Sequence, residues 1–257
     1  MSLADANIDA RILILDIETK PNRVFTWGLW DQNIGLSQII EPGGTICFAA
    51  KWYGETKVHF ASDHHDGHDE MVAAAWRLMD EADIIVGYNH RSFDVKHLHA
   101  EFVRLRLGPP SPHKDVDLLT VARGQFKMPS NKLDFIAQEL GVGHKVKHTG
   151  FDLWTGCMDG CDKAWRTMKK YNIHDVRLTE ELYDRLRPWI KNHPNLNMWR
   201  TVRVSGCDKC GSDDLTDSGF KYTQTRAYKQ FVCNNCGGYS HATHHEPDRA
   251  QYRKGSA

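Results

Sequence analysis

The sequence predicts an α/β domain followed by a small metal-stabilised module, and two observations support this division. Residues 11–190 alternate short apolar runs with longer stretches of helical periodicity, which is the pattern of a sheet flanked by helices. Residues 199–257 contain two Cys-x-x-Cys pairs in a segment too short to bury a core without metal. We therefore expect one domain over residues 1–198 and a second over residues 199–257.

The composition indicates a globular, cytoplasmic protein with no membrane association. Of the 257 residues, 40% are hydrophobic and 26% are charged. No segment approaches the roughly 20 consecutive apolar residues that cross a membrane, and the polar N-terminus lacks a signal peptide's apolar region. In a reducing compartment the seven cysteines are metal ligands or free thiols rather than disulfides. The net charge is zero, but a slightly basic tail follows an acidic body.

The first buried strand is expected over residues 12–19, where four apolar residues precede Asp16, Ile17 and Glu18. Side chains two apart in a strand point to the same face, so both carboxylates project together while Ile17 points into the core. Adjacent carboxylates repel unless a cation lies between them, and oxygen ligands suit Mg²⁺ or Mn²⁺. The alternative is a strand end whose acids are merely solvated.

The next elements extend the sheet and add helices. Alternating residues predict strands over 45–53 and 57–62, joined as a hairpin at Gly54-Glu55, which with the first strand could form an antiparallel unit. A helix follows over 70–82, and a short buried strand over 83–88.

Ser92 is a plausible N-cap for a helix over 93–107, which places Asp94 in its first turn at the carboxyl end of the preceding strand. Ligand sites in open α/β sheets favour that position. A further strand is expected over 115–119, with Asp117 as an extra acid near its end.

The last part of the domain contains two helices separated by a polar loop. Ser130 is expected to cap a helix over 131–140 that ends at Gly141, and residues 141–160 form the loop. A long helix follows over 162–190. Tyr171 and Asp175 are four residues apart on one face of it, and a carboxylate on the packed side of a helix requires a partner.

Three motifs in this order resemble those of the tyrosine-bearing branch of the DEDD exonuclease superfamily. They are Asp16-Ile-Glu18, Gly87-Tyr-Asn-His-Arg-Ser-Phe-Asp94 and Tyr171-Asn-Ile-His-Asp175. The resemblance is greatest to the proofreading exonuclease domains of family B DNA polymerases and to stand-alone phage exonucleases. Residues 127–141 also resemble a helical region that these domains carry between the second and third motifs.

The resemblance implies a ribonuclease-H-like fold, with a mixed five-stranded sheet flanked by helices, and a metal-dependent 3′→5′ exonuclease. It implies that two Mg²⁺ or Mn²⁺ ions are held by Asp16, Glu18, Asp94 and Asp175, and that Tyr171 orients the attacking water. Two ions about 4 Å apart activate the nucleophile and stabilise both reacting oxygens in an in-line displacement. The branch that uses histidine does not fit, because Lys170 occupies the corresponding position.

Substrate contacts are expected from Asn89, at the same strand end, and from Asn131 and Lys132, which begin the helix near the cleft. Capping and solvation explain these three residues equally well. The expected partner is the 3′ end of single-stranded nucleic acid, DNA more than RNA, and replication or repair proteins are further candidate partners. The alternatives are a non-catalytic nucleic-acid-binding protein and a structure-selective endonuclease on the same fold.

The C-terminal module resembles a zinc ribbon. Cys207 and Cys210 are separated by 22 residues from Cys233 and Cys236, a spacing that predicts one structural Zn²⁺ held by four thiolates. Strands are expected over residues 220–225 and 228–232. Basic and aromatic residues interleave along them, as on nucleic-acid-binding surfaces, although a purely structural appendage is the alternative. The basic residues expected to contact nucleic acid are Lys221, Arg226 and Lys229.

Overall fold

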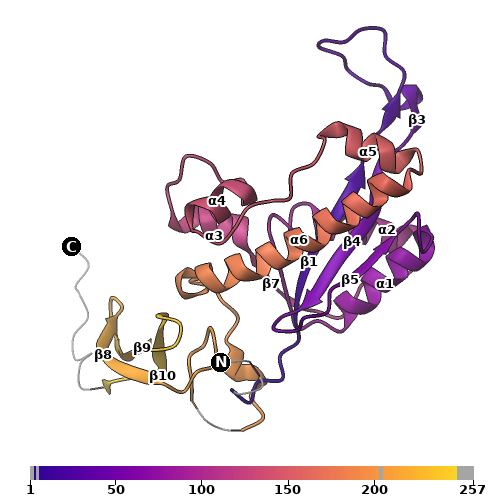
Figure 1. Ribbon diagram of the computed structural model, residues 1–257. Coiled ribbons are helices and arrows are strands. Elements are labelled where there is room, and N and C mark those ends of the chain that lie inside the picture. The colour runs from indigo at the N-terminus through magenta and orange to yellow at the C-terminus, as the bar shows by residue number, and fades with distance from the viewer. Residues whose placement is uncertain (1–2, 4–5, 203–204, 248–257) are drawn as a thin grey trace. The chain divides into compact units, whose positions relative to one another are not determined.

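The computed structural model describes residue 3, residues 6–202 and residues 205–247 of the chain (Figure 1). The chain divides into two compact units, one formed by Arg11–Leu182 and the other by Met1–Ala10 together with Tyr183–Ala257. Among the described residues, no helix is both long and apolar enough to span a membrane. The domain boundary between residues 198 and 199 stays a prediction.

The larger unit is built on a mixed five-stranded sheet, as predicted. Its strand order is β5-β4-β1-β6-β7. The central strand β1 pairs antiparallel with β4 and parallel with β6, and the predicted antiparallel unit of β1, β4 and β5 is confirmed. The bounds of the five strands are Ile12–Lys20 (β1), Gly44–Trp52 (β4), His59–Ser62 (β5), Ile84–Gly87 (β6) and Lys114–Asp117 (β7).

Helices cover both faces of this sheet, which explains why β1 is apolar on both sides (Figure 1). Leu13, Leu15 and Ile17 pack against α1 (His68–Asp80) and α2 (Asp94–Arg104). The intervening residues of β1 face α6 (Asp162–Leu186). The strict alternation of β1 therefore decides which side chains enter the core and which face α6.

The remaining helices of the unit differ in part from the sequence-based expectation. α3 (Leu118–Gln125) follows β7 directly, because the Asp117 carboxylate accepts hydrogen bonds from the amides of Leu119 and Thr120 as an N-cap. The expected loop over residues 141–160 contains α5 (Phe151–Met158). The helix expected from residue 131 is the shorter α4 (Leu133–Glu139).

Two predicted caps are wrong. Phe93, not Ser92, occupies the N-cap position of α2, and Lys132, not Ser130, occupies that of α4. The Ser130 hydroxyl instead accepts a hydrogen bond from the Lys132 amide, just before α4 begins. Gly141 ends α4 with φ of 65°, a left-handed conformation that glycine adopts without strain, as predicted.

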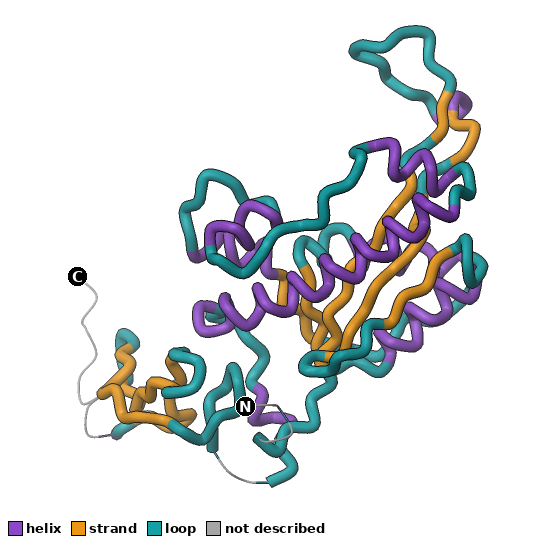
Figure 2. The backbone as a smooth tube through the Cα atoms, viewed as in Figure 1, coloured by secondary structure: helices purple, strands orange, loops and turns teal. Residues whose placement is uncertain are grey.

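Shorter elements complete the chain. Between β1 and β4 lie β2 (Arg23–Val24), a 3₁₀ turn (Leu36–Gln38) and β3 (Ile39–Glu41), and Figure 2 shows the extended loop between β2 and β3. Two 3₁₀ turns, Arg187–Trp189 and Leu196–Trp199, follow α6. The second sheet has the order β10-β9-β8 and contains the two strands expected there plus a third. Its strands are Leu215–Tyr222 (β8), Ala227–Cys233 (β9) and Tyr239–His245 (β10).

Candidate active site and metal centres

Asp16 and Glu18 lie on the face of β1 that is covered by α6. The residues opposite them on β4 are Ala49 and Cys47, both of which have small side chains. The register of β1 and β4 shifts between Glu18 and Thr19, so a bulge follows directly after the second acid. Bulges re-aim side chains and are common next to active sites. The local sequence thus places two carboxylates side by side at the end of the regular sheet.

Asp94 reaches the same strand from α2. Parallel pairing of β1 with β6 ends at Ile14 and Val86, so the sheet leaves the Ile17 amide free to donate elsewhere. That amide donates to Oδ1 of Asp94 at 2.9 Å, and the Asp94 side chain is almost fully buried. The hydrogen bond fixes Asp94 against the backbone between Asp16 and Glu18.

The turn before α2 explains how Asp94 arrives there. A Cβ atom on Gly87, the last residue of β6, would lie 2.7 Å from Cβ of His90 and 3.0 Å from the Leu15 carbonyl oxygen. Only glycine allows so close an approach of the turn to β1. His90 is fully buried and its Nε2 lies 2.9 Å from Oδ1 of Asp115 on β7. The turn is therefore anchored to both neighbouring strands.

The fourth carboxylate, Asp175, comes from the inner face of α6 together with Tyr171 and Asn172. Asn172 donates from Nδ2 to Oδ2 of Asp16 at 2.6 Å, which fixes the orientation of that carboxylate. The Lys145 ammonium donates to Oδ2 of Asp175 at 2.5 Å and to the Tyr171 hydroxyl at 2.9 Å. These contacts join β1, α6 and the loop before α5 around one group of acids.

Burial raises the pKa of these carboxyl groups in the metal-free protein. Burial, followed by the charges of Asp94 and Glu18, raises the pKa of Asp16 well above its usual value. Burial raises the pKa of Glu18 to about 8, against the opposing effect of the Lys145 charge, and that of Asp94 to about 6. Asp175 shifts in the same direction for the same first reason. Repelling buried acids of this kind mark functional sites.

The arrangement fits a divalent cation. One oxygen each from Asp16, Glu18 and Asp175 lies within 4.8 Å of the others. Oδ1 of Asp175 is buried and has no hydrogen-bond partner among the described residues, which leaves it free to coordinate a cation. The group within this distance does not include Asp94, whose Oδ1 is engaged by the Ile17 amide. A carboxylate cluster is the donor set that Mg²⁺ and Mn²⁺ prefer.

Lys145 is a site residue that sequence reasoning placed only in a polar loop. Burial by itself would lower its pKa, but the Asp175 carboxylate raises it far above the usual value, so the ammonium keeps its charge. Burial and Asp175 also raise the pKa of Tyr171, which keeps its phenolic proton. No local pattern signals this role, because the contact with Asp175 spans 30 residues of sequence.

None of the three residues predicted to contact the substrate forms a hydrogen bond or ion pair with the acid cluster among the described residues. Asn89 adopts a left-handed backbone conformation, with φ of 67°. Its backbone N–H donates to Oδ1 of Asp117 at 3.0 Å. The Asn131 carbonyl accepts a hydrogen bond from the Tyr88 hydroxyl at 2.7 Å, and Lys132 is the exposed N-cap residue of α4. The Asp117 carboxylate is occupied by backbone amides, so it serves the turn and α3 rather than the acid cluster.

The four cysteines of the second sheet form a compact group. Sγ of Cys207 lies 3.6 Å from Sγ of Cys236, and the same distance separates Cys210 from Cys233. All four sulfur atoms lie within 4.8 Å of one another, as ligands of one tetrahedral ion would. Gly211 and Gly237 follow the second cysteine of each pair with φ near 75°, which permits the tight turn around such a site.

Two of the three basic residues expected to bind nucleic acid on this sheet, Lys221 and Arg226, are exposed and have no ion-pair partner among the described residues. The third, Lys229, is exposed but pairs with Asp217, with 3.1 Å between Nζ and Oδ2. The cysteine group is thus compatible with a zinc ribbon that presents a basic hairpin.

The sheet order, the helices on both faces and the acids between β1 and α6 together define a nuclease-type ribonuclease-H-like fold. The sequence profile of the RNase H superfamily matches residues 35–187, and the chain belongs to this superfamily. The match begins after β1 and does not include Asp16 and Glu18. The positions of these two acids follow from the pairing of β1 with β4 in the sheet.

Comparison with solved structures shows the same fold. The structure of the family B DNA polymerase from the hyperthermophilic archaeon Pyrobaculum calidifontis is similar over 70% of this chain, with a TM-score of 0.54 and 19% sequence identity. The similar region spans 25% of that polymerase chain. No curated protein matches this chain.

Proposed function

We propose that this protein is a metal-dependent 3′→5′ exonuclease of the tyrosine-bearing DEDD branch that acts on single-stranded nucleic acid, DNA more than RNA. The observation that carries the proposal is the convergence of Asp16, Glu18 and Asp175 from β1 and α6, within 4.8 Å of one another. Acids brought this close together repel one another, and a divalent cation bound between them offsets that repulsion.

The chain's own groups have distinct tasks in this proposal. Asp16, Glu18, Asp94 and Asp175 hold two Mg²⁺ or Mn²⁺ ions, which when bound supply a nucleophilic water and stabilise the charge on the phosphate oxygens. Asn172 keeps one oxygen of Asp16 in a fixed direction through its 2.6 Å hydrogen bond. Tyr171, which keeps its proton, orients water rather than acting as a base.

Lys145 adds a positioning role to this set. Its ammonium bonds the Tyr171 hydroxyl and Asp175 at once, so it fixes the phenol relative to the acids. A fixed cation at this point also favours a negatively charged phosphate group in the site.

We propose one structural Zn²⁺ on Cys207, Cys210, Cys233 and Cys236, within a domain over residues 199–257. The close approach of the four sulfur atoms supports it. In this proposal the ion stabilises the β8–β10 sheet. Lys221 on β8, Arg226 in the turn that follows and Lys229 on β9 contact phosphate groups of the substrate.

A single-stranded DNA labelled at its 5′ end, incubated with Mg²⁺ or Mn²⁺, tests the activity. A ladder of successively shorter labelled products is expected, and the Asp16→Ala variant should produce none. A single internal product would identify an endonuclease, and an intact strand that is nevertheless bound would identify a non-catalytic binding protein. An RNA strand of the same sequence measures the preference between the two polymers.

A further inference from the structure

The outer face of α6 carries an unusual density of positive charge. Five cationic side chains occupy one side of this helix over about 21 Å, at a rise of 1.5 Å per residue. The only acid between the first and last of them is Asp175, which is 1% exposed and faces the sheet. The five are Lys163, Arg166, Lys169, Lys170 and Arg177.

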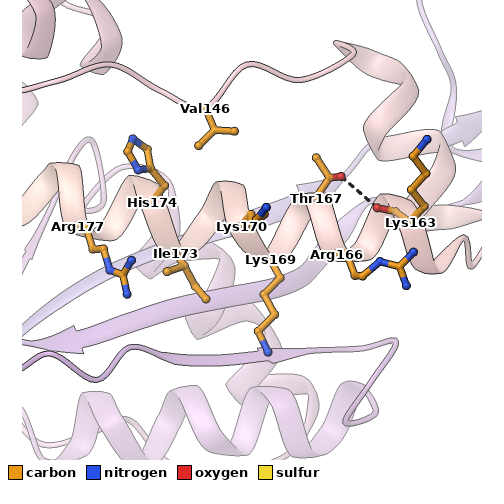
Figure 3. Close-up of a pocket in the computed structure, with 9 residues that line it drawn as sticks. All are labelled: Val146, Lys163, Arg166, Thr167, Lys169, Lys170, Ile173, His174 and Arg177. Atoms are coloured by element: carbon orange, nitrogen blue, oxygen red, sulfur yellow. Dashed lines mark hydrogen bonds between the residues drawn. The ribbon is translucent and has the colours of Figure 1, made fainter.

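These cations line a hollow of about 890 Å³ whose other wall includes Val146, in the loop before α5 (Figure 3). Val146 and Ile173 give the hollow an apolar part, and Thr167 and His174 add polar groups. A second hollow of about 450 Å³ shares Lys163 and Thr167 with the first and is also lined by Lys147 and His148. We call the two adjoining hollows the basic groove.

The five α6 cations of the basic groove lack acidic partners in the described part of the protein, although Asp152 lines the second hollow. The α6 residues that form ion pairs in the larger unit are acids: Asp162 with His64, Asp175 with Lys145 and Glu180 with Lys51. The five cations form no ion pair with any described residue, and Lys169 lies over the ring of Phe60 instead. Like charges three or four residues apart destabilise a helix. A polyanion in the groove would remove that repulsion.

The loop before α5 connects this groove to the acid cluster. Lys145 reaches Asp175 and Tyr171 on the inner side of α6, whereas its neighbour Val146 lines the groove. His174 fixes the loop to the helix, because its Nε2 lies 2.7 Å from the His144 carbonyl oxygen. Figure 2 shows this loop running beside α6. A strand that leaves the acid cluster over this loop meets the groove next.

We propose that the basic groove binds the sugar–phosphate backbone of the nucleic-acid strand whose 3′ end lies at the acid cluster; this rests on the proposed nuclease function. A polymer with regularly repeated negative charge matches a row of cations along a helix better than a single small anion does. The groove holds the strand by charge and does not distinguish bases, since its cations contact phosphate groups.

The test is a binding experiment on the full chain in an Asp16→Ala background, so that the strand is not hydrolysed. The groove variant combines Arg166→Ala, Lys170→Ala and Arg177→Ala. The control variant removes the same charge elsewhere, through Lys57→Ala, Arg106→Ala and Lys114→Ala, three exposed residues that line neither hollow. Fluorescence anisotropy of a labelled single strand of about 20 nucleotides gives Kd across a salt series, and circular dichroism confirms that each variant is folded.

The groove variant should bind at least about 10-fold more weakly at 100 mM salt. Its plot of log Kd against log salt should be flatter by about 2, since each phosphate contact on a single strand contributes about 0.7. The control should stay close to the background protein. A rescue variant, Arg166→Lys with Lys170→Arg and Arg177→Lys, should bind normally because charge is retained.

An unchanged slope in a folded groove variant overturns the proposal. It is also overturned if the variant loses binding of a polyglutamate peptide but keeps that of DNA, because the occupant is then an acidic protein segment. Hydrolysis by the wild-type protein is measured separately. If the wild-type protein hydrolyses the strand but the groove variant keeps an unchanged salt slope, only the proposed groove is rejected. If the groove variant shows a flatter slope but the wild-type protein does not hydrolyse the strand, only the proposed nuclease function is rejected.

Discussion

Replacing Glu18 by glutamine should stabilise the metal-free protein at neutral pH, because this carboxyl group is buried, and lies beside other acids. Burial raises the pKa of Glu18 from 4.5 to about 8. Since the folded-state pKa is the higher one, the stability that Glu18 contributes is complete below pH 4.5 and is lost as the pH rises through 8. Between pH 4.5 and 7 the loss is about 3 kcal/mol, at 1.36 kcal/mol per pH unit. That corresponds to about 6–12 °C in melting temperature for a unit of this size.

The assay is thermal melting of the wild-type protein and Glu18→Gln in EDTA from pH 5 to 8.5. The two melting temperatures should be close at pH 5, and the variant should melt higher as the pH rises. With Mn²⁺ present, the wild-type protein should melt at the higher temperature. Its Glu18 carboxylate binds the ion more tightly than glutamine does, and a ligand that binds the folded state stabilises it. Glu139→Gln, an exposed change on α4, is the matched control and should follow the wild type. A constant difference between wild type and Glu18→Gln across this pH range would refute the reasoning.

Four further outcomes test the sites. Asp175→Ala should lower hydrolysis by several orders of magnitude, and retention of more than about a tenth of wild-type turnover at saturating Mn²⁺ would remove it from the ligand set. Tyr171→Phe should slow hydrolysis by roughly 10- to 1000-fold with little change in melting temperature, whereas equal rates would leave the tyrosine a packing residue. Cys233→Ser should reduce bound zinc, measured by a colorimetric chelator, from one equivalent per chain to none; retained zinc would contradict the four-cysteine site. In the salt series, a variant without the basic hairpin should show a slope flatter by about 2, and an unchanged slope would reject phosphate binding there. That variant combines Lys221→Ala, Arg226→Ala and Lys229→Ala.

The central part of the fold could be predicted because its signals are local and strong. β1 is covered on both faces, so its apolar run and the two acids that interrupt it mark both the strand and the face that the carboxylates occupy. The helical period over α6 likewise places Tyr171 and Asp175 on one inner face. Each inference needs only a few consecutive residues, and the structure confirms these placements.

The short elements could not be predicted, because tertiary contacts define them. α5 has eight residues between Gly150 and Asp159, too few for its periodicity to stand out in a polar segment. β10 contains three histidines and lacks the β-branched pattern of a strand, and its pairing with β9 begins just after the second cysteine pair. α3 depends on the Asp117 carboxylate acting as a cap, a role that sequence alone does not distinguish from metal ligation.

Lys145 shows how a correct physical argument can still miss a residue. A buried carboxylate at Asp175 requires a positive partner, and the sequence suggested only a metal ion. The fold supplies an internal cation as well, from a loop 30 residues away. The two partners need not compete, because Lys145 occupies Oδ2 of Asp175 while Oδ1 is buried without a partner among the described residues. We infer that the ammonium keeps Asp175 in place before metal binds and leaves its second oxygen free for the ion. A fixed ligand costs less conformational entropy on binding than a mobile one.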